Sequence, residues 1–207
     1  MKKLISTSLM MAMFLCTGTL HGQGAQNAPY RKFSVSTTFL SLTNFESEAT
    51  NLQHYEFHLG YKVTPKDRVE LKFATWKLFE PMGIPIWDPK FREKSEYYPG
   101  RLRETGIGAT YQRLLWKGLF AQIEILPLKK TYLDETNKKV DTGFKLYTSY
   151  HLGYHIQFLR NRFFIEPQVH CNYWPVDTDG PQEFDIVEKR WNNYFLLEPN
   201  LYIGVKF

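Results

Sequence analysis

Apolar and polar residues alternate along most of the chain, and this pattern predicts β-strands. Clear examples are residues 33–39, 55–63 and 69–73, where every second side chain is apolar. Alternation with a period of two places successive side chains on opposite faces of a strand. Further alternating segments span residues 104–112, 119–127, 144–158, 163–174 and 195–207. The pattern therefore predicts eight strands, with bulges or bends at Pro167 and Pro199.

The connections between these strands alternate in length. Three are short, at residues 64–68, 113–118 and 159–162, and four are long, at residues 42–54, 78–103, 128–143 and 175–194. Short turns on one side and long loops on the other are typical of an antiparallel barrel that crosses a membrane. The sequence predicts an all-β fold, an eight-stranded antiparallel up-and-down transmembrane β-barrel with short periplasmic turns and long extracellular loops.

The two faces of the predicted strands differ in charge. One phase carries no Asp, Glu, Lys or Arg, and a charge on the lipid face at mid-bilayer costs ~2–4 kcal/mol for Lys or Arg. We therefore assign this phase to the outside of the barrel. The opposite phase, assigned to the lumen, carries ten charged residues: Glu56, Lys62, Glu70, Lys72, Glu104, Glu124, Lys145, Glu166, Glu198 and Lys206.

The beginning of the sequence resembles a secretory signal peptide. Two lysines precede an apolar run over residues 4–20, and small and polar residues follow at 22–26. We expect residues 1–26 to be a signal peptide and residues 27–207 to form the barrel. Cleavage would remove Lys2 and Lys3 and lower the formal net charge from +5 to +3, which gives no reason to expect nucleic-acid binding. It would also remove Cys16, so that Cys171 could form no intramolecular disulfide.

Composition narrows the remaining classes. Hydrophobic residues make up 43% of the chain and charged residues 23%, which excludes a disordered chain. After residue 30 no apolar run reaches 18 residues, which excludes a bundle of membrane-spanning helices. Aromatic residues reach 16%, and girdles of rings at the two membrane interfaces would account for them. The tyrosines on the outward phase are Tyr55, Tyr61, Tyr111, Tyr150, Tyr154 and Tyr173.

The last predicted strand resembles the C-terminal insertion signal of Gram-negative outer-membrane β-barrel proteins. It reads Leu-Tyr-Ile-Gly-Val-Lys-Phe, with the signal residues Tyr202, Gly204, Val205 and Phe207. Strand number and loop order also resemble the small barrels with outer-membrane protein A- or W-like architecture. The resemblance implies a monomer in the bacterial outer membrane, in contact with its lipid and lipopolysaccharide, and recognised by the barrel-assembly machinery during insertion.

The charged lumen favours a structural interpretation. A barrel of eight strands is narrow enough for side chains to fill it, and buried charges must be paired and hydrogen-bonded. We expect a polar, plugged lumen and a non-enzymatic structural or surface-interaction role. The expected network comprises Glu56, His58, Lys62, Glu70, Lys72, Glu124, Lys145 and Glu198.

A second interpretation is a lipid A-modifying enzyme, similar to the deacylase or acyltransferase barrels. If residues 159 and 162 pair, His151 lies opposite His170, Ser149 opposite Asn172, His155 opposite Glu166, and Tyr147 opposite Trp174. A hydrolase needs a serine near a histidine that a third group orients. The catalytic candidates are therefore Ser149, His151, His155, Glu166 and His170. The chain lacks the His-x-Ser order of the deacylases, so enzymatic activity stays open.

The spacing of the histidines and the placement of the charges also bear on a metal site and on a soluble fold. His151 and His155 are ~13 Å apart by the strand rise, too far to share one ion, so we expect no metal and no cofactor. A soluble periplasmic lipocalin-like binder would carry its charges outside.

The loop at 78–103 contains Phe79, Trp87, Phe91, Tyr97 and Tyr98. We expect this loop to fold over the mouth of the barrel or to bind an extracellular partner or glycan.

Overall fold

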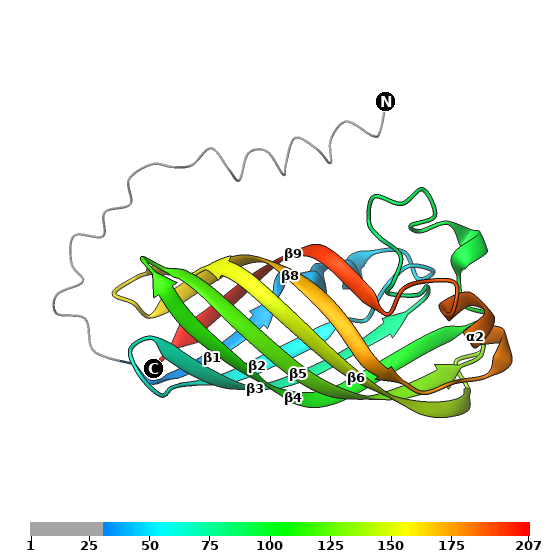
Figure 1. Ribbon diagram of the computed structural model, residues 1–207, viewed down its shortest axis with the longest axis horizontal. Helices are drawn as coiled ribbons and strands as arrows, with labels where there is room; N and C mark the ends of the chain where they lie inside the picture. Colours follow the sequence, from blue (N-terminus) through cyan, green and yellow to red (C-terminus); the bar gives the residue numbers. More distant parts are fainter. Residues whose placement is uncertain (1–30) are drawn as a thin grey trace.

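The computed structural model describes residues 31–207, so the predicted signal peptide lies outside the described residues. These residues form one antiparallel sheet that closes into a ring (Figure 1). The strands are β1 (Phe33–Thr38), β2 (Tyr55–Lys62), β3 (Asp67–Leu78), β4 (Arg101–Trp116), β5 (Leu119–Leu133), β6 (Lys139–Tyr154), β7 (Ile156–Phe158), β8 (Phe163–Asp177) and β9 (Tyr194–Lys206). The helical segments are η2 (Phe39–Phe45), η3 (Lys94–Glu96) and α2 (Gln182–Glu188).

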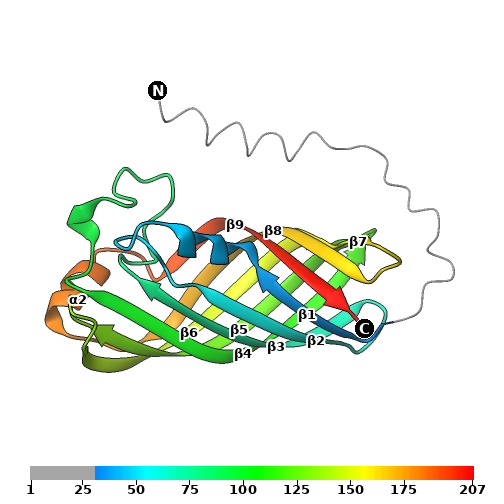
Figure 2. The same cartoon turned by 180° about the vertical axis from the view of Figure 1, so that it is seen from behind.

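The ring has eight members because β7 continues β6 past a break at His155. Each strand pairs with its neighbours in the chain, β6 and β7 both pair with β8, and β1 pairs with β9 to close the ring. The prediction of an eight-stranded up-and-down antiparallel barrel is confirmed. Figure 2 shows β1 and β9 side by side, with the C-terminus at the end of the short turns, which we call the turn end. The opposite end is the loop end.

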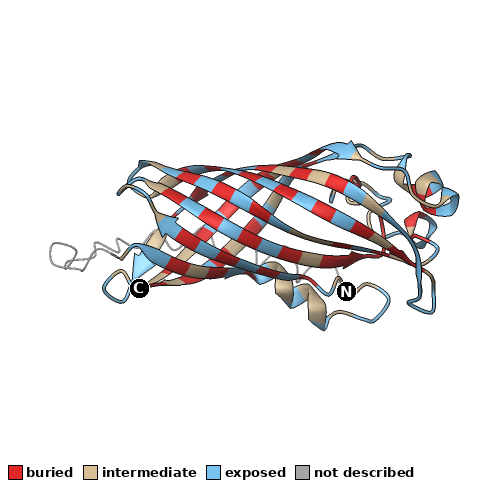
Figure 3. Ribbon diagram, turned by 90° about the horizontal axis from the view of Figure 1, so that it is seen from below, coloured by how far each residue is buried: buried red, intermediate tan, exposed pale blue. Residues whose placement is uncertain are grey.

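Burial alternates along the strands as the sequence pattern predicts. Bands of buried and exposed residues run across the wall in Figure 3. The outward residues Leu59, Leu71, Ile107 and Ile125 are 48–60% exposed. Of the ten charged residues assigned to the lumen, all but Lys62 and Glu198 are buried, and these two are half-buried. The wall is therefore apolar outside and charged inside.

Two predicted features of the strands are wrong. The connection at 128–143 is not a long loop, because β5 and β6 continue their pairing to Leu133 and Lys139 and leave a turn of five residues between them. Phe195, assigned to the outside, is buried inside the barrel. The reason is a bulge in β9, where Leu196 and Leu197 together oppose Cys171 and reverse the phase of the strand.

The interior changes character along the barrel. The half near the turn end is filled by charged and polar side chains, whereas the loop end holds an apolar core that includes Trp76, Leu102 and Leu128. Phe184 and Val187 of α2 cover this core, which places α2 as a lid on the loop end. Within residues 31–207, none of the helices is long and apolar enough to span a membrane.

Candidate functional site: the lumen and the cavity at its loop end

The first polar cluster of the lumen, near the turn end, centres on Glu166. Arg68 donates two hydrogen bonds from Nη2 to this carboxylate, at 2.8 and 3.0 Å, and its Nε lies 2.9 Å from Glu70 Oε1. His155 Nδ1 lies 2.5 Å from Glu166 Oε1, and Lys206 Nζ lies 2.6 Å from His155 Nε2. An ammonium can only donate, so Nε2 accepts and the imidazole proton sits on Nδ1, facing the carboxylate.

The second cluster lies on β2, β3 and β5. Lys72 Nζ lies 2.8 Å from both carboxylate oxygens of Glu124 and 3.1 Å from Glu56 Oε1. His58 lies between Glu56 and Glu70, with Nε2 and Nδ1 at 2.7 and 3.0 Å from their oxygens. Because carboxylates accept hydrogen bonds, the imidazolium form of His58 satisfies both contacts. The charges of this cluster are thus paired across three strands.

The third cluster contains the candidates Ser149 and His170. Ser149 Oγ lies 3.3 Å from His170 Nδ1 and donates to Asn172 Oδ1 at 2.6 Å. His170 Nε2 lies 3.0 Å from Glu198 Oε2, which also accepts from Asn172 Nδ2 at 2.7 Å. The register predicted for this hairpin is confirmed at His151, which faces His170, and at Ser149, which faces Asn172. It shifts at Tyr147, although the Tyr147 and Trp174 rings still stack at 6.4 Å.

The structure separates the five catalytic candidates. Ser149, His151 and His170 lie together on β6 and β8, whereas His155 and Glu166 belong to the cluster near the turn end. Ser149 donates its one hydroxyl proton to Asn172 Oδ1 and therefore does not direct it toward His170 Nδ1, as a nucleophilic serine requires. Both ring nitrogens of His151 lack a hydrogen-bond partner, and its ring lies 4.8 Å from that of His170.

The loop end carries a fourth set of ion pairs. Lys145 Nζ lies 2.8 Å from Glu104 Oε1 and 3.2 Å from Glu188 Oε1 of α2. Trp76 Nε1 donates to Glu104 Oε2 at 2.7 Å. Lys130 Nζ lies 3.6 Å from Glu188 Oε2, so α2 is held to the barrel through two buried lysines.

The two longest loops are joined to one another above this point. Trp191 Nε1 donates to Glu96 Oε2 at 3.0 Å, and Arg190 Nη2 lies 3.2 Å from the same oxygen. Phe79, Ile84 and Tyr98, all within the first of these loops, are buried. The loop at 78–103 thus folds over the mouth, as its aromatic content predicts.

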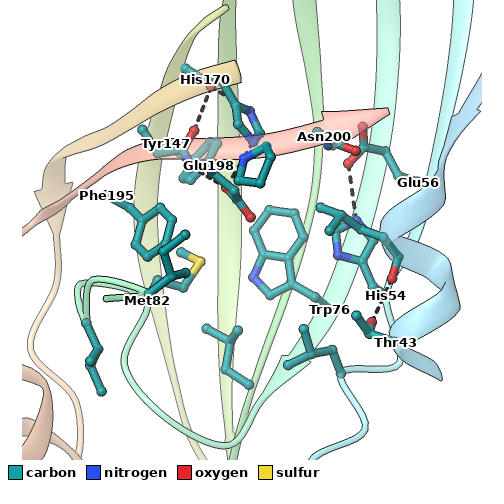
Figure 4. Close-up of a pocket in the computed structure, with 18 of the residues that line it drawn as sticks. Thr43, His54, Glu56, Trp76, Met82, Tyr147, His170, Phe195, Glu198 and Asn200 are labelled. Atoms are coloured by element: carbon teal, nitrogen blue, oxygen red, sulfur yellow. Dashed lines mark hydrogen bonds and ion pairs between the residues drawn. The ribbon is translucent and has the colours of Figure 1, made fainter. Parts of the chain in front are cut away.

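We call these two joined loops, residues 79–100 and 178–193, the cap. A cavity of about 310 Å³ lies between the cap and the third cluster (Figure 4). Trp76 stands in its middle, with His54 and Glu56 on one side and Phe195 and Glu198 on the other. Ser149, His170 and Asn172 form part of its polar floor. Among residues 31–207, no group of three or more His, Cys, Asp and Glu side chains is arranged to hold a metal ion.

Glu80 lines the same cavity from the loop. Burial raises the pKa of Glu80 to about 7, and the backbone N–H of Arg92, which donates to Oε2 at 2.9 Å, offsets part of the rise. Its protonation therefore changes near neutral pH, within the cap of the barrel.

Several residues of these clusters were missed by sequence reasoning. The alternation places Arg68 in a turn and Lys130 in a loop, yet both are buried in the barrel. Arg68 lies one residue and Lys130 three residues beyond the clear alternation, which therefore does not include them. Extending the phase of each predicted strand outward by one or two pairs would have placed both in the lumen.

Comparison with known proteins gives a likeness of fold alone. No family model matches the chain, and no curated protein matches it. The outer membrane protein Ail of Yersinia pestis, solved in a phospholipid bilayer nanodisc, is 9% identical, with a TM-score of 0.46 over 86% of this chain and 100% of that chain. Neisserial surface protein A is 11% identical, with a TM-score of 0.41 over 85% of this chain and 94% of that chain. A crystal structure of Ail with the heparin analogue sucrose octasulfate is 10% identical, with a TM-score of 0.37 over 84% of this chain and 93% of that chain.

Proposed function

We propose that the chain is an integral β-barrel of the bacterial outer membrane with a plugged lumen and a non-enzymatic role in surface interaction. The observation that carries this proposal is the distribution of polarity: the outward strand positions are apolar and exposed, and the charged positions are buried. A soluble barrel places apolar side chains inside and charges outside, whereas lipid favours the reverse. The same distribution argues against a soluble lipocalin-like binder.

The plugged lumen is supported by the ion pairs across it. Lys72 joins β3 to Glu124 on β5, and Arg68 joins β3 to Glu166 on β8, so that both pairs cross the interior. A path for ions would have to break such contacts, each of which involves buried charge.

The surface role is supported by the cap. The long loops pack on one another and on the apolar core, and they present Trp87 and Ile86 to solvent. A rigid scaffold that positions exposed loop residues is the usual arrangement for binding. A lipid A-modifying activity has less support, because the hydroxyl proton of Ser149 is directed to Asn172 and not to a histidine.

Fractionation tests the membrane placement. We expect the protein in the outer-membrane fraction and, in detergent, faster gel migration before boiling than after it. Full solubility without detergent would contradict the placement.

Reconstitution in planar bilayers tests the plugged lumen: we expect little or no conductance, and large stable channels would refute the plug.

Labelling of intact cells tests the orientation. In a Cys171→Ser background, Glu135→Cys lies in a turn at the loop end and Arg160→Cys lies in a turn at the opposite end. A membrane-impermeant maleimide should label the first variant and not the second. The opposite result would reverse the assigned orientation while leaving the membrane placement intact.

A further inference from the structure

The wall of the barrel lacks a strand on one side of its loop end. β1 pairs with β2 only as far as Ser36, opposite His58, and with β9 only as far as Thr38, opposite Tyr202. Beyond these points β2 runs on to Tyr55 and β9 runs back to Tyr194. The residues of β9 from Tyr194 to Leu201 therefore pair with β8 alone, and the wall is open beside them.

The 3₁₀-helix η2 covers this opening but is bonded along one border only. Asn44 ties it to the start of β2, because its Nδ2 donates to the His54 carbonyl at 2.8 Å and its Oδ1 accepts from the His54 N–H at 2.5 Å. On the β9 side the bond is made by Thr38, just before the helix, to Asn200 at 2.6 Å. Within the described part of the chain, no hydrogen bond joins residues 39–45 to residues 194–199. Pro199, on this border, has no N–H to offer.

The outer face of η2 is apolar. Side chains three residues apart eclipse one another in a 3₁₀-helix, and Phe39, Leu42 and Phe45 are all exposed. Leu196 and Leu197, at the bulge of β9, continue this apolar surface across the border. If the barrel is placed in a membrane as proposed above, the border between η2 and β9 faces hydrocarbon.

The inner face of the same border lines the cavity. Leu40 and Thr43 contribute from η2, and Phe195 and Pro199 contribute from β9. A volume of about 310 Å³ is at the lower end of ligand sites, which are ~300–1,000 Å³, and suits one hydrocarbon chain better than two. The cavity therefore adjoins the lipid side of the wall through a border without hydrogen bonds.

The charge of the cavity limits which polar group a bound ligand could carry. Four carboxylates line it, and they face two cationic side chains and two histidines: Glu56, Glu80, Glu124 and Glu198 against Lys72, Arg92, His54 and His170. Lys72 is already paired with Glu124 and Glu56. Asn200 Nδ2 is a buried donor without a partner, and Glu198 is a half-buried acceptor beside it in the lining. A carboxylate or phosphate head would meet excess negative charge. A hydroxyl can accept from Asn200 Nδ2 and donate to Glu198, whereas an ammonium can donate to Glu198.

We propose that this cavity binds a single-chain amphiphile with an uncharged or cationic head group, which enters from the membrane between η2 and β9. The head lies on the polar floor near Glu198 and Asn200, and the chain extends toward Leu40 and Phe195. The proposal rests on the proposed membrane placement, and fractionation of the wild-type protein tests that placement separately.

Photolabelling in a bilayer tests the site. The full-length mature protein is placed in phosphatidylcholine nanodiscs that contain a monoacylglycerol with a 12-carbon chain and a diazirine at mid-chain. We expect labelled peptides from η2 and from the cavity wall around Trp76 and Met82. The same diazirine on dodecanoic acid should label these peptides at least tenfold less. Labelling confined to outward residues, or equal labelling by the carboxylate probe, would overturn the proposal.

Two variants of η2 provide a matched pair. Leu40→Trp places a larger side chain on the cavity wall at the border, and Leu42→Trp places the same side chain on the outer face. Leu40→Trp should lower labelling of the cavity wall at least tenfold, and Leu42→Trp should leave it within twofold. Heat-modifiable migration reports whether each variant is folded. If Leu40→Trp does not fold, the contrast between the two wild-type probes decides the question, and undiminished labelling in a folded Leu40→Trp protein would refute entry at this border.

Discussion

Arg68 illustrates how single residues hold the interior of the barrel together. Its guanidinium is buried and contacts Glu70 on its own strand and Glu166 across the lumen. A planar guanidinium can serve two carboxylates at once, which a lysine cannot do with the same geometry. Arg113, by contrast, contacts Asp67 at 2.8 Å but is exposed. The two arginines offer the same chemistry in two environments.

The cost of breaking these two contacts should differ. Glu166→Ala removes a carboxylate that Arg68, His155 and Gln112 all contact, and it should destabilise the barrel by about 3–5 kcal/mol, because a buried charge loses its partner. Arg113→Gln should have little effect on stability, as is typical of exposed pairs. Urea unfolding in micelles measures both. A similar loss for the two variants would show that the Glu166 cluster contributes no more than a surface pair.

Glu80 gives the cap a pH dependence with a defined sign. Its folded-state pKa of about 7 lies above the value of 4.5 expected for an unfolded chain. Between these two values the folded state binds more protons, so the stability of the cap falls as pH rises from about 4.5 to about 7 and is constant above that range. At 1.36 kcal/mol per pKa unit, the upper limit of the loss is about 3 kcal/mol.

Glu80→Gln should remove this dependence. The amide oxygen can still accept from the Arg92 N–H, and no charge is buried. Hydrogen exchange of residues 79–100 at pH 5 and pH 8 measures the effect: protection should drop at pH 8 in the wild-type protein and stay level in the variant. Equal pH profiles would show that Glu80 does not control the cap.

At the scale of elements, the sequence predicts strands well and their ends poorly. The number of strands and the pairing of His151 with His170 follow from alternation and from one short turn. The contact between His170 and Glu198 could not be derived in this way, because it depends on the β8–β9 register and on the bulge at Leu196 and Leu197. The sequence also does not predict that η2 replaces the end of β1, because the apolar residues of 39–45 do not follow the spacing of an α-helix. These failures lie in and around the cavity.

The composition of the β5–β6 hairpin explains why the sequence predicts a long loop there. Apart from Val140, residues 134–142 are polar on both faces, since the strands there extend past the apolar belt. The turn is organised by Asp134, whose Oδ1 accepts from the Thr136 and Lys138 N–H groups and from Thr136 Oγ1.

Asp134→Ala should loosen this hairpin locally. Loss of the three hydrogen bonds should destabilise the turn, and the effect should be confined to the end of the hairpin. Amide exchange of residues 130–142 should accelerate while that of residues 119–127 stays unchanged. Asp134→Asn, which keeps the accepting oxygen, is the matched control and should resemble the wild-type protein.

At the scale of the whole molecule, the last strand closes the ring and contains the residues predicted to form an insertion signal. The Phe33 and Phe207 backbones exchange two hydrogen bonds, at 3.1 and 3.0 Å, and their rings stack at 6.4 Å. Packing inside the barrel also explains the glycine at position 204, because a Cβ there would lie 2.2 Å from the ring of Phe164. Of the predicted signal residues, Phe207 is exposed, whereas the Tyr202 hydroxyl faces the lumen and donates to Glu56 at 2.5 Å.

Phe207→Ala separates recognition from closure. The variant keeps the backbone hydrogen bonds, so refolding of purified protein into micelles should be close to normal. If Phe207 is part of an insertion signal, the amount of protein in the outer membrane of expressing cells should fall several-fold. Normal amounts in cells would show that this side chain is not required for recognition.

The short pairing of β1 with β9 also has a mechanical consequence. This seam runs only along residues 33–38, whereas β6 and β8 are joined from Lys145 to Gly153. The strands on its two sides are at opposite ends of the sequence, so no turn holds them together once they part. Under tension or heat the ring should therefore tear along this seam before any hairpin opens, and the barrel should become a curved sheet with β1 and β9 as its two free edges.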